Sequence, residues 1–317
     1  MNVISKAKLQ QIMALYGLRV QVNVPLSELS HWKVGGNADV VVQPKNKYEL
    51  IQLRQWIHEN SLPSIVIGNT TNLLFADEGL QAIVIKIDSN FSKMSVNDTE
   101  IITEPGIWVP SLARLAMQAG LSGIEHACGI PGTLGGLVVM NGGSQRKGIG
   151  SVLSYVETVD KEGNLKRYTN QQCEFAYRSS IFQENDEVIT EVGMTLERSR
   201  SKESIRKEML DILSSRRKKF PRKQPNCGSV FVSNPDMYEE YGPPGKVIEE
   251  CGLKDLSKGG AQVSSLHANF IINNSNAKAE DILYLINTIR KKVHQMTGYK
   301  MVVEAKFVTQ NGQIQEI

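Results

Sequence analysis

The sequence has no long apolar segment and no apolar start. No aliphatic run is longer than that of residues 137–140, which is far short of the roughly 20 residues needed to cross a membrane. The opening segment, MNVISKAKLQQIMALYG, alternates polar and apolar residues and lacks the apolar core and cleavage site of a signal peptide. We therefore interpret it as mature cytoplasmic sequence and expect no membrane partner.

Cysteine and histidine are sparse and scattered. The four cysteines, at positions 128, 173, 227 and 251, form no CxxC pair, and the five histidines show no HExxH spacing. A structural zinc site needs such clustered ligands, and disulfides are rare in reducing compartments. The sequence thus predicts free thiols, no metal site, and bland core or surface roles for the histidines.

Charge is nearly balanced along the 317 residues, with a formal net charge of +3. A surface for nucleic acid needs many positive charges spread over many phosphate contacts, so we expect no nucleic-acid partner. The exception is the run RRKKFPRK at 216–223. It is either a solvated helix end or a patch for a small phosphorylated ligand, and its place directly before PNCGSVF (225–231) favours the ligand.

Both common nucleotide-binding motifs are missing. No GxGxxG opens a helix after a strand, and no GxxxxGK[ST] is present, so neither a Rossmann site nor a P-loop is indicated. Two other segments could cradle a pyrophosphate, IGNTTNLLFADEG (67–79) and GIPGTLGG (129–136). Each is either a structural turn or a place where backbone N–H groups approach an anion. Two such segments in one chain favour an extended dinucleotide.

The first third alternates strand and helix patterns. Residues 40–44, 64–68 and 82–87 are short β-rich apolar runs, and residues 47–60 carry Leu50, Leu53 and Ile57 on one helical face. This order predicts a small βαβ-type unit.

The rest of the chain mixes antiparallel strands with helices. We expect strands at 100–106, 154–160, 188–197 and 268–274, and helices at 110–120, 203–218 and 279–298, two of which end at a glycine. A final strand is predicted over 301–308. Period-two alternation sets Glu304 opposite the apolar residues of that strand, either as a surface residue or as a functional carboxylate.

Read in order, the motifs resemble the flavin-dependent UDP-N-acetylenolpyruvoylglucosamine reductases of peptidoglycan synthesis. The segments that carry the resemblance span roughly residues 20–310: HWKVGGNADVVVQP (31–44), IGNTTNLL (67–74), residues 105–143, CEFAYRSSIF (173–182), PNCGSVF, residues 245–273 and VVEAKFV (302–308). The compact stretch from 242 to 270 resembles the shorter subclass, which lacks an inserted substrate-covering loop.

The resemblance implies an α+β fold: a two-part FAD-binding (PCMH-like) module plus a third α+β domain that binds the substrate. We expect the first FAD-binding subdomain at 1–88, the second at 89–200 and the substrate-binding domain at 201–317. The implied cofactor is FAD and the implied hydride donor is NADPH. The implied partner is a UDP-sugar substrate, and we expect a monomer.

The resemblance also implies the reaction, which is reduction of the enolpyruvyl group to the lactyl ether of UDP-N-acetylmuramate. Arg178 matches the residue that holds the substrate carboxylate, a task that suits a planar guanidinium. Ser229 matches the proton donor, and Glu304 matches the glutamate that stabilises the developing charge. Cys227 is interpreted as a small buried filler, although a thiol beside a cationic run could also react.

Further positions follow from the same match. Lys219 corresponds to a lysine that contacts the substrate diphosphate. The residues matched to flavin binding are Gly68, Asn72, Pro131, Gly132, Gly135, Gly136 and Asn141.

Some segments differ from the family's usual sequence. The first phosphate loop reads Gly-Asn-Thr-Thr-Asn where the family prefers Gly-Ser-Asn, and residues 144–151 carry two additional cations. Two alternatives therefore stay open beside the reductase: an FAD-dependent oxidase or paralogue acting on another sugar or hydroxy acid, and a non-catalytic sugar-nucleotide-binding module.

Overall fold

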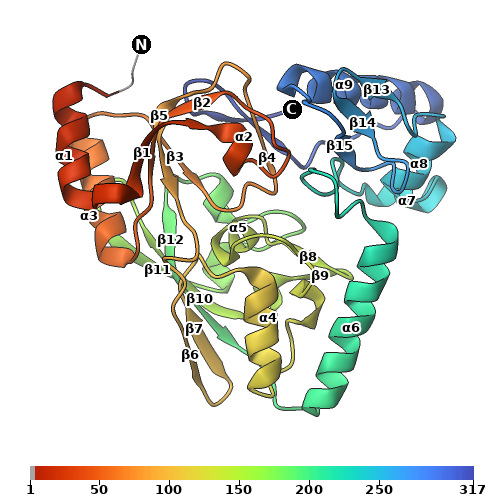
Figure 1. Cartoon of the computed structure of the whole chain (residues 1–317). Coiled ribbons are helices and arrows are strands. Elements are labelled where there is room, and N and C mark those ends of the chain that lie inside the picture. Colours follow the sequence, from red (N-terminus) through yellow and green to blue (C-terminus); the bar gives the residue numbers. More distant parts are fainter. Residues whose placement is uncertain (1–3) are drawn as a thin grey trace.

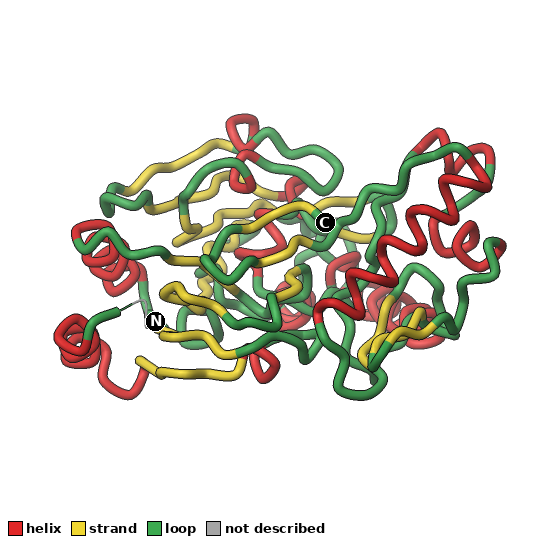
Figure 2. Tube along the Cα trace, turned by 90° about the horizontal axis from the view of Figure 1, so that it is seen from above, coloured by secondary structure: helices red, strands yellow, loops and turns green. Residues whose placement is uncertain are grey.

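The computed structural model describes residues 4–317, so the first three residues of the predicted first subdomain lie outside the described part. The described chain folds into three packed parts (Figure 1). Two of them are built around sheets, and the third lies beside them, joined through the long helix α6 (Lys202–Lys219). Seen from above, the helices of the third part lie at the opposite end from α1 and α3 (Figure 2).

The first part is a mixed four-stranded sheet in the order β1-β2-β5-β3. Strands β2 and β3 both run parallel to β5, which confirms the predicted βαβ unit. Alternate residues of β5 enter two different apolar clusters, one under α1 and α3 and one on the other face, so both faces are buried. The elements are α1 (Lys6–Tyr16), η1 (Gly17–Arg19), β1 (Val20–Pro25), α2 (Leu26–Leu29), β2 (Asn37–Val42), α3 (Lys47–Glu59), β3 (Ser64–Ile67), β4 (Leu73–Phe75) and β5 (Leu80–Lys86).

Helix α1 was not predicted, because the opening segment shows no clear apolar face. The Ser5 hydroxyl caps the helix by accepting from Lys8 N at 3.3 Å. Burial of Ile12 and Tyr16 against α3 then holds α1 in place, so tertiary packing decides a segment with a weak local pattern.

The second part is an antiparallel five-stranded sheet in the order β11-β10-β12-β7-β6. One face packs on helices α4 and α5 and on the buried side of α6. The elements are β6 (Met94–Asn97), β7 (Glu100–Thr103), α4 (Val109–Gln118), η2 (Glu125–Ala127), α5 (Leu134–Val139), β8 (Gly143–Ser144), β9 (Lys147–Gly148), η3 (Ile149–Val152), β10 (Leu153–Val159), β11 (Leu165–Thr169), η4 (Gln171–Cys173), η5 (Ile181–Gln183) and β12 (Val188–Thr195).

The third part packs α7, α8 and α9 against the three-stranded sheet β13-β14-β15. Trp32, from the first part, is fully buried in this core and donates from Nε1 to the carbonyl of Ile271 at 2.7 Å. Asp77 accepts from Ala279 N at 2.9 Å, at the start of α9. The elements are α7 (Pro235–Glu240), α8 (Pro244–Glu250), β13 (Ser257–Lys258), β14 (Ala261–Val263), β15 (Ile271–Asn273), α9 (Ala279–Thr297), β16 (Lys306–Val308) and β17 (Ile314–Glu316).

The end of the chain returns to the first part. Strand β16 pairs in parallel with β4 and antiparallel with β17. The predicted strand over 301–308 is therefore wrong in its first half. Residues 301–305 instead contact residues 230–232 through one isolated antiparallel β-bridge, between Phe231 and Val303. The domain limits at 88 and 200 stay a prediction. No helix among residues 4–317 is long and apolar enough to span a bilayer.

Candidate active site

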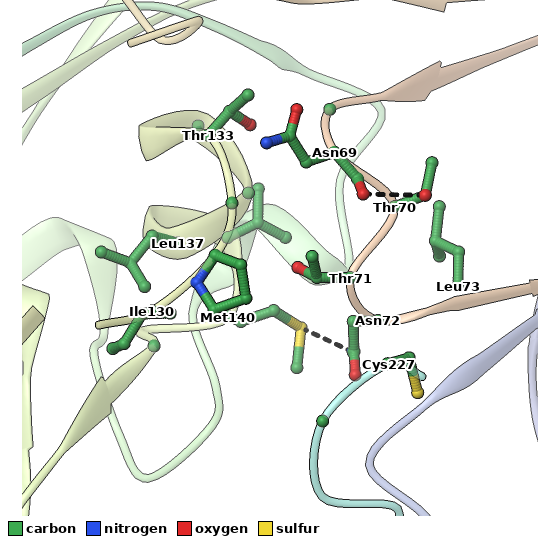
Figure 3. Close-up of a pocket in the computed structure, with 18 of the residues that line it drawn as sticks. Asn69, Thr70, Thr71, Asn72, Leu73, Ile130, Thr133, Leu137, Met140 and Cys227 are labelled. Carbon is green, nitrogen blue, oxygen red and sulfur yellow. Dashed lines mark hydrogen bonds between the residues drawn. The ribbon is translucent and has the colours of Figure 1, made fainter. Parts of the chain in front are cut away.

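A cavity of about 1650 Å³ opens where the three parts meet. Its volume exceeds the roughly 300–1,000 Å³ of a pocket for one drug-sized ligand, so there is room for an extended dinucleotide beside a second molecule. Figure 3 shows three segments meeting there: the loop from Asn69 to Asn72, the segment from Ile130 to Met140, and the turn that carries Cys227.

Most of the predicted site residues lie in the wall of this cavity. From the first two parts these are Gly68, Asn72, Pro131, Gly132, Gly135, Gly136 and Arg178, and from the third part Ser229 and Glu304. Asn141 and Lys219 do not line it. The predicted residues in its wall thus come from distant positions of the chain, from Gly68 to Glu304.

The two glycine-bearing loops approach each other closely. A Cβ on Gly68 would lie 2.2 Å from Thr133 Oγ1, so only glycine fits at this contact. A Cβ on Gly135 would lie 3.1 Å from Pro105 Cβ, while the Gly135 N–H donates to the carbonyl of Pro105 at 2.9 Å. The loops thus form a narrow cradle of exposed backbone, which suits a pyrophosphate bridge.

Arg178 and Glu304 form an ion pair across the cavity. Arg178 Nε lies 2.8 Å from Glu304 Oε1, with 24% and 17% of the two side chains exposed. The Nε–H is not aligned for a hydrogen bond, so the contact is one of charge. Arg178 also donates from Nη2 to the carbonyl of Gly143 at 3.2 Å. Burial raises the pKa of the Glu304 carboxyl although Arg178 opposes the shift, so the carboxyl keeps its proton to higher pH than usual.

Ser229 follows a tight turn at Gly228, whose φ of +86° favours glycine. Its hydroxyl makes no hydrogen bond to residues 4–317 and is free to face a ligand. Cys227 lies two residues earlier and is 5% exposed. Burial raises the pKa of its thiol well above the usual range, so the thiol stays protonated and unreactive, as expected for a filler.

Asn72 has a structural task that the sequence did not reveal. Its Nδ2 donates to the backbone carbonyl of Glu304 at 3.0 Å, and its own carbonyl accepts from Lys306 N at 2.9 Å. Glu304 N in turn donates to the carbonyl of Val230 at 2.7 Å. The predicted flavin contact therefore also fixes the backbone at Glu304, and only the fold could show this.

Asn141 supports the site from behind. Its Nδ2 donates to the carbonyl of Ala176 at 2.7 Å, and its Oδ1 accepts from Gly150 N at 3.0 Å. Ala176 lies two residues before Arg178, which lines the cavity. In the described chain Asn141 is thus placed to hold the loop that carries Arg178.

The basic run presents other cations to the cavity than the one predicted. Lys219 is exposed at the end of α6, whereas Arg216 and Arg222 line the cavity. The Arg216 guanidinium lies 4.8 Å from the Phe220 ring centroid, and within residues 4–317 it has no hydrogen bond or ion pair. Its stem lies against Gly129, where a Cβ would be 2.5 Å from Arg216 Cδ. Helical spacing from the Met209 and Leu213 face could have indicated Arg216.

Residues 4–317 contain no group of three or more His, Cys, Asp or Glu side chains placed to hold a metal ion. All four cysteines are free. The polar groups gathered in the cavity are instead a carboxyl, a hydroxyl, guanidinium groups and backbone amides.

Two family models match the chain. Residues 38–169 match the FAD binding domain, and residues 220–308 match the UDP-N-acetylenolpyruvoylglucosamine reductase C-terminal domain. The first match covers the two loops of the cradle, and the second covers Ser229 and Glu304. The residues present thus fit FAD.

Similar whole proteins agree with these matches. The chain is 41% identical to UDP-N-acetylenolpyruvoylglucosamine reductase 1 of Corynebacterium glutamicum, over 94% of this chain and 88% of that protein. It is 38% identical to a reductase of the same name from Heliobacterium modesticaldum, over 91% of this chain and 90% of that protein. The crystal structure of the reductase from Thermus caldophilus superposes with a TM-score of 0.74 at 29% identity, covering 91% of this chain and 97% of that one. The chain therefore belongs to the UDP-N-acetylenolpyruvoylglucosamine reductase family and has its α+β fold, an FAD-binding module joined to the reductase C-terminal domain.

Proposed function

We propose that the cavity reduces UDP-N-acetylenolpyruvoylglucosamine to UDP-N-acetylmuramate, with Arg178, Ser229 and Glu304 as its catalytic residues. FAD held against the two glycine-bearing loops would supply the hydride, which comes from NADPH. The observation that carries the proposal is the convergence of these three side chains, from distant parts of the chain, on the cavity that the two glycine-bearing loops also line. Family membership favours this reaction over the oxidase and the non-catalytic module.

Arg178 binds the substrate carboxylate. Its guanidinium has a carboxylate partner already, so it can exchange Glu304 for the substrate without losing charge compensation. As hydride adds to the methylene carbon of the enolpyruvyl group, negative charge builds up on the next carbon and its carboxylate, and a fixed guanidinium stabilises it.

Glu304 and Ser229 complete the electrostatics. Burial raises the pKa of the Glu304 carboxyl, which favours the protonated form that can donate a hydrogen bond to the charged carboxylate. Ser229 supplies the proton that the carbon next to the carboxylate needs. Its hydroxyl is a weak acid, but an enolate-like carbon is a strong base. A hydroxyl held within hydrogen-bond reach of that carbon can therefore transfer its proton to it.

The diphosphate of the substrate requires cations. Arg216 and Arg222 line the cavity, and Lys219 lies exposed between them in sequence. We assign the closest diphosphate contact to Arg216, because its stem lies against Gly129, its guanidinium lies over the Phe220 ring, and its charge has no hydrogen bond or ion pair among the described residues. Lys219 then acts from the rim. A cytoplasmic, monomeric enzyme without a nucleic-acid partner completes the proposal.

The test combines spectrum and turnover. The purified protein should bind FAD and show its absorption, and NADPH oxidation should require the enolpyruvyl substrate. Ser229→Ala should leave flavin reduction by NADPH intact and slow the transfer to substrate by about 10²–10⁴-fold, the usual contribution of a general acid. A flavoprotein without substrate-dependent oxidation would point to the oxidase, and a protein that refuses FAD to the binding module. Size-exclusion chromatography reports the oligomeric state.

A further inference from the structure

Asn226 lies three residues before Ser229 and uses its whole side chain inside the turn that carries this serine. The residue is 7% exposed. Its Nδ2 donates to the carbonyls of Pro221 and Gln224, at 3.1 and 2.7 Å, and its Oδ1 accepts from Gly228 N at 2.9 Å. Every polar atom of the amide is therefore spent on fixing the local backbone, which is the pattern of an Asx turn.

The chain beyond Ser229 is fixed as well. Asn269 accepts from Val230 N through its backbone carbonyl at 2.8 Å, and its side chain donates to and accepts from the backbone of Phe231, both at 2.9 Å. Ser229 is thus held from both sides by buried amides, while its own hydroxyl stays free. That arrangement fixes the position of a side chain without occupying it.

The turn is also tied to the cofactor loop. His31 donates from Nδ1 to the backbone carbonyl of Asn226 in a short hydrogen bond, and His31 N donates to Thr70 Oγ1 at 2.9 Å. Thr70 belongs to the first phosphate loop, and its hydroxyl can donate to the carbonyl of Leu29 or of Asn69, at 2.9 and 2.8 Å (Figure 3).

Thr70 has a φ of +54°, which is strained for a β-branched residue. It is buried, and the hydrogen bonds of its hydroxyl hold it in this conformation. The threonine that replaces the family's usual residue is therefore part of a hydrogen-bonded chain, Thr70–His31–Asn226–Gly228, that ends beside Ser229.

From these contacts we propose that Asn226 is a positioning residue for the Ser229 hydroxyl, and that His31 couples it to the cofactor loop. The inference rests on the proposed role of Ser229 as proton donor. A proton is transferred only over hydrogen-bond distance, so a shift of about 1 Å in the hydroxyl slows the step by up to about 10²-fold. Loss of the Asn226 side chain frees Gly228 and lets Ser229 move by such amounts.

The test is a double-mutant cycle on the flavin-loaded protein. The variants are Asn226→Ala, Ser229→Ala and the double variant, and stopped-flow absorbance of the flavin follows the two half-reactions separately. Asn226→Ala should slow oxidation of the reduced flavin by substrate about 10- to 100-fold. The rate of flavin reduction by NADPH should stay within about twofold of that of the unchanged protein. In the Ser229→Ala background, Asn226→Ala should change the rate of flavin oxidation by less than about twofold. Once the Ser229 hydroxyl is absent, no proton donor remains for Asn226 to position.

The control is Asn234→Ala. Asn234 caps α7 by accepting from Met237 N at 3.0 Å and does not line the cavity. The variant therefore removes a similar amide hydrogen bond to the backbone and leaves the Ser229 turn unchanged. This variant should leave both half-reactions unchanged. If Asn226→Ala does not fold, Asn226→Asp serves in the same cycle, because it keeps the acceptor for Gly228 N and loses only the two donors.

The outcomes separate the two ideas. A factor from Asn226→Ala that is the same with and without Ser229, or no slowing at all, would overturn the positioning role. A Ser229→Ala variant as fast as the unchanged protein would instead overturn the proposed function of Ser229.

Discussion

Arg178 and Arg216 line the same cavity and differ in what they face. Arg178 lies in a loop with a φ of +58°, pairs with Glu304 and contacts the Tyr177 ring at 5.2 Å. Arg216 sits on α6 with its guanidinium over the Phe220 ring, and burial lowers the pKa of its guanidinium. The charge of Arg178 is paired with a carboxylate of the protein, whereas the charge of Arg216 has no ion pair within residues 4–317.

The difference separates catalysis from binding. Removing one partner of a buried ion pair leaves the other charge uncompensated, so in the proposed reaction Arg178 exchanges Glu304 for the substrate carboxylate. Arg216 gains a charged partner only when an anionic ligand binds. The free energy of that interaction is the same in the bound substrate and in the transition state. Interactions of the first kind change the rate of the chemical step, and those of the second kind change affinity.

The largest effect should come from Arg178→Lys. Lysine keeps the charge but loses the planar fork, so it cannot hold the carboxylate through two parallel bonds. We expect oxidation of the reduced flavin by substrate to slow about 10²–10³-fold, the loss typical for one electrostatic donor, with KM little changed. Stopped-flow absorbance measures the step. Arg167→Lys, on the exposed strand β11, is the control, and an unaltered rate in Arg178→Lys would contradict the assignment.

Arg216→Met should act on binding instead. Methionine keeps most of the stem against Gly129 and removes the charge. A hydrogen bond to a charged group contributes about 1.5–3 kcal/mol, so KM for the UDP-sugar should rise about 10- to 100-fold while kcat falls by less than about threefold. Titration of the flavin-loaded protein with UDP gives the dissociation constant directly.

Arg217→Met provides the matched control, since Arg217 is the next residue of α6, is exposed and does not line the cavity. Equal effects of the two variants would show that net charge matters rather than position. A weaker FAD affinity in Arg216→Met, with UDP binding unchanged, would move the contact to the cofactor.

The comparison of the two arginines also marks where sequence reasoning reaches its limit. Motif order and helical or strand periodicity were enough for the fold class, for the βαβ unit and for α9 with its end at Gly298. The three catalytic candidates follow from the resemblance to the family, through the segments CEFAYRSSIF, PNCGSVF and VVEAKFV.

Among the basic residues 216–223, helical spacing singles out Arg216 only once the buried face of α6 is known. Which of six neighbouring cations faces the cavity depends on the rotation of α6, and that is set by packing of Ile205, Met209 and Ile212 on the second sheet. Similarly, Asn72 and Asn141 have partners 232 and 35 residues away, and no pattern within either motif indicates them.

Glu304 makes a prediction on stability. Its pKa is raised by burial, so the folded state prefers the neutral carboxyl more than the unfolded state does. Stability from this group is present below the ordinary carboxyl pKa and is lost as pH rises through the raised value. Between the ordinary and the raised carboxyl pKa, the unchanged protein should therefore lose stability with rising pH relative to Glu304→Gln. Its unfolding equilibrium constant should rise by less than tenfold per pH unit relative to that of the variant. Urea midpoints at several pH values measure this, and a difference that stays constant with pH would contradict it.

The smallest effect should come from Lys219→Met. An exposed rim charge attracts a diphosphate through water, where screening is strong, so we expect KM for the UDP-sugar to rise only about two- to threefold at low salt. The rise should disappear near 1 M salt, where the Debye length falls to about 3 Å, whereas the effect of Arg216→Met should persist because Arg216 is shielded by Phe220 and Gly129. Steady-state kinetics of both variants along one salt series compare the two positions. A salt-resistant loss at Lys219 as large as that at Arg216 would place Lys219 in direct contact with the substrate and reverse their roles.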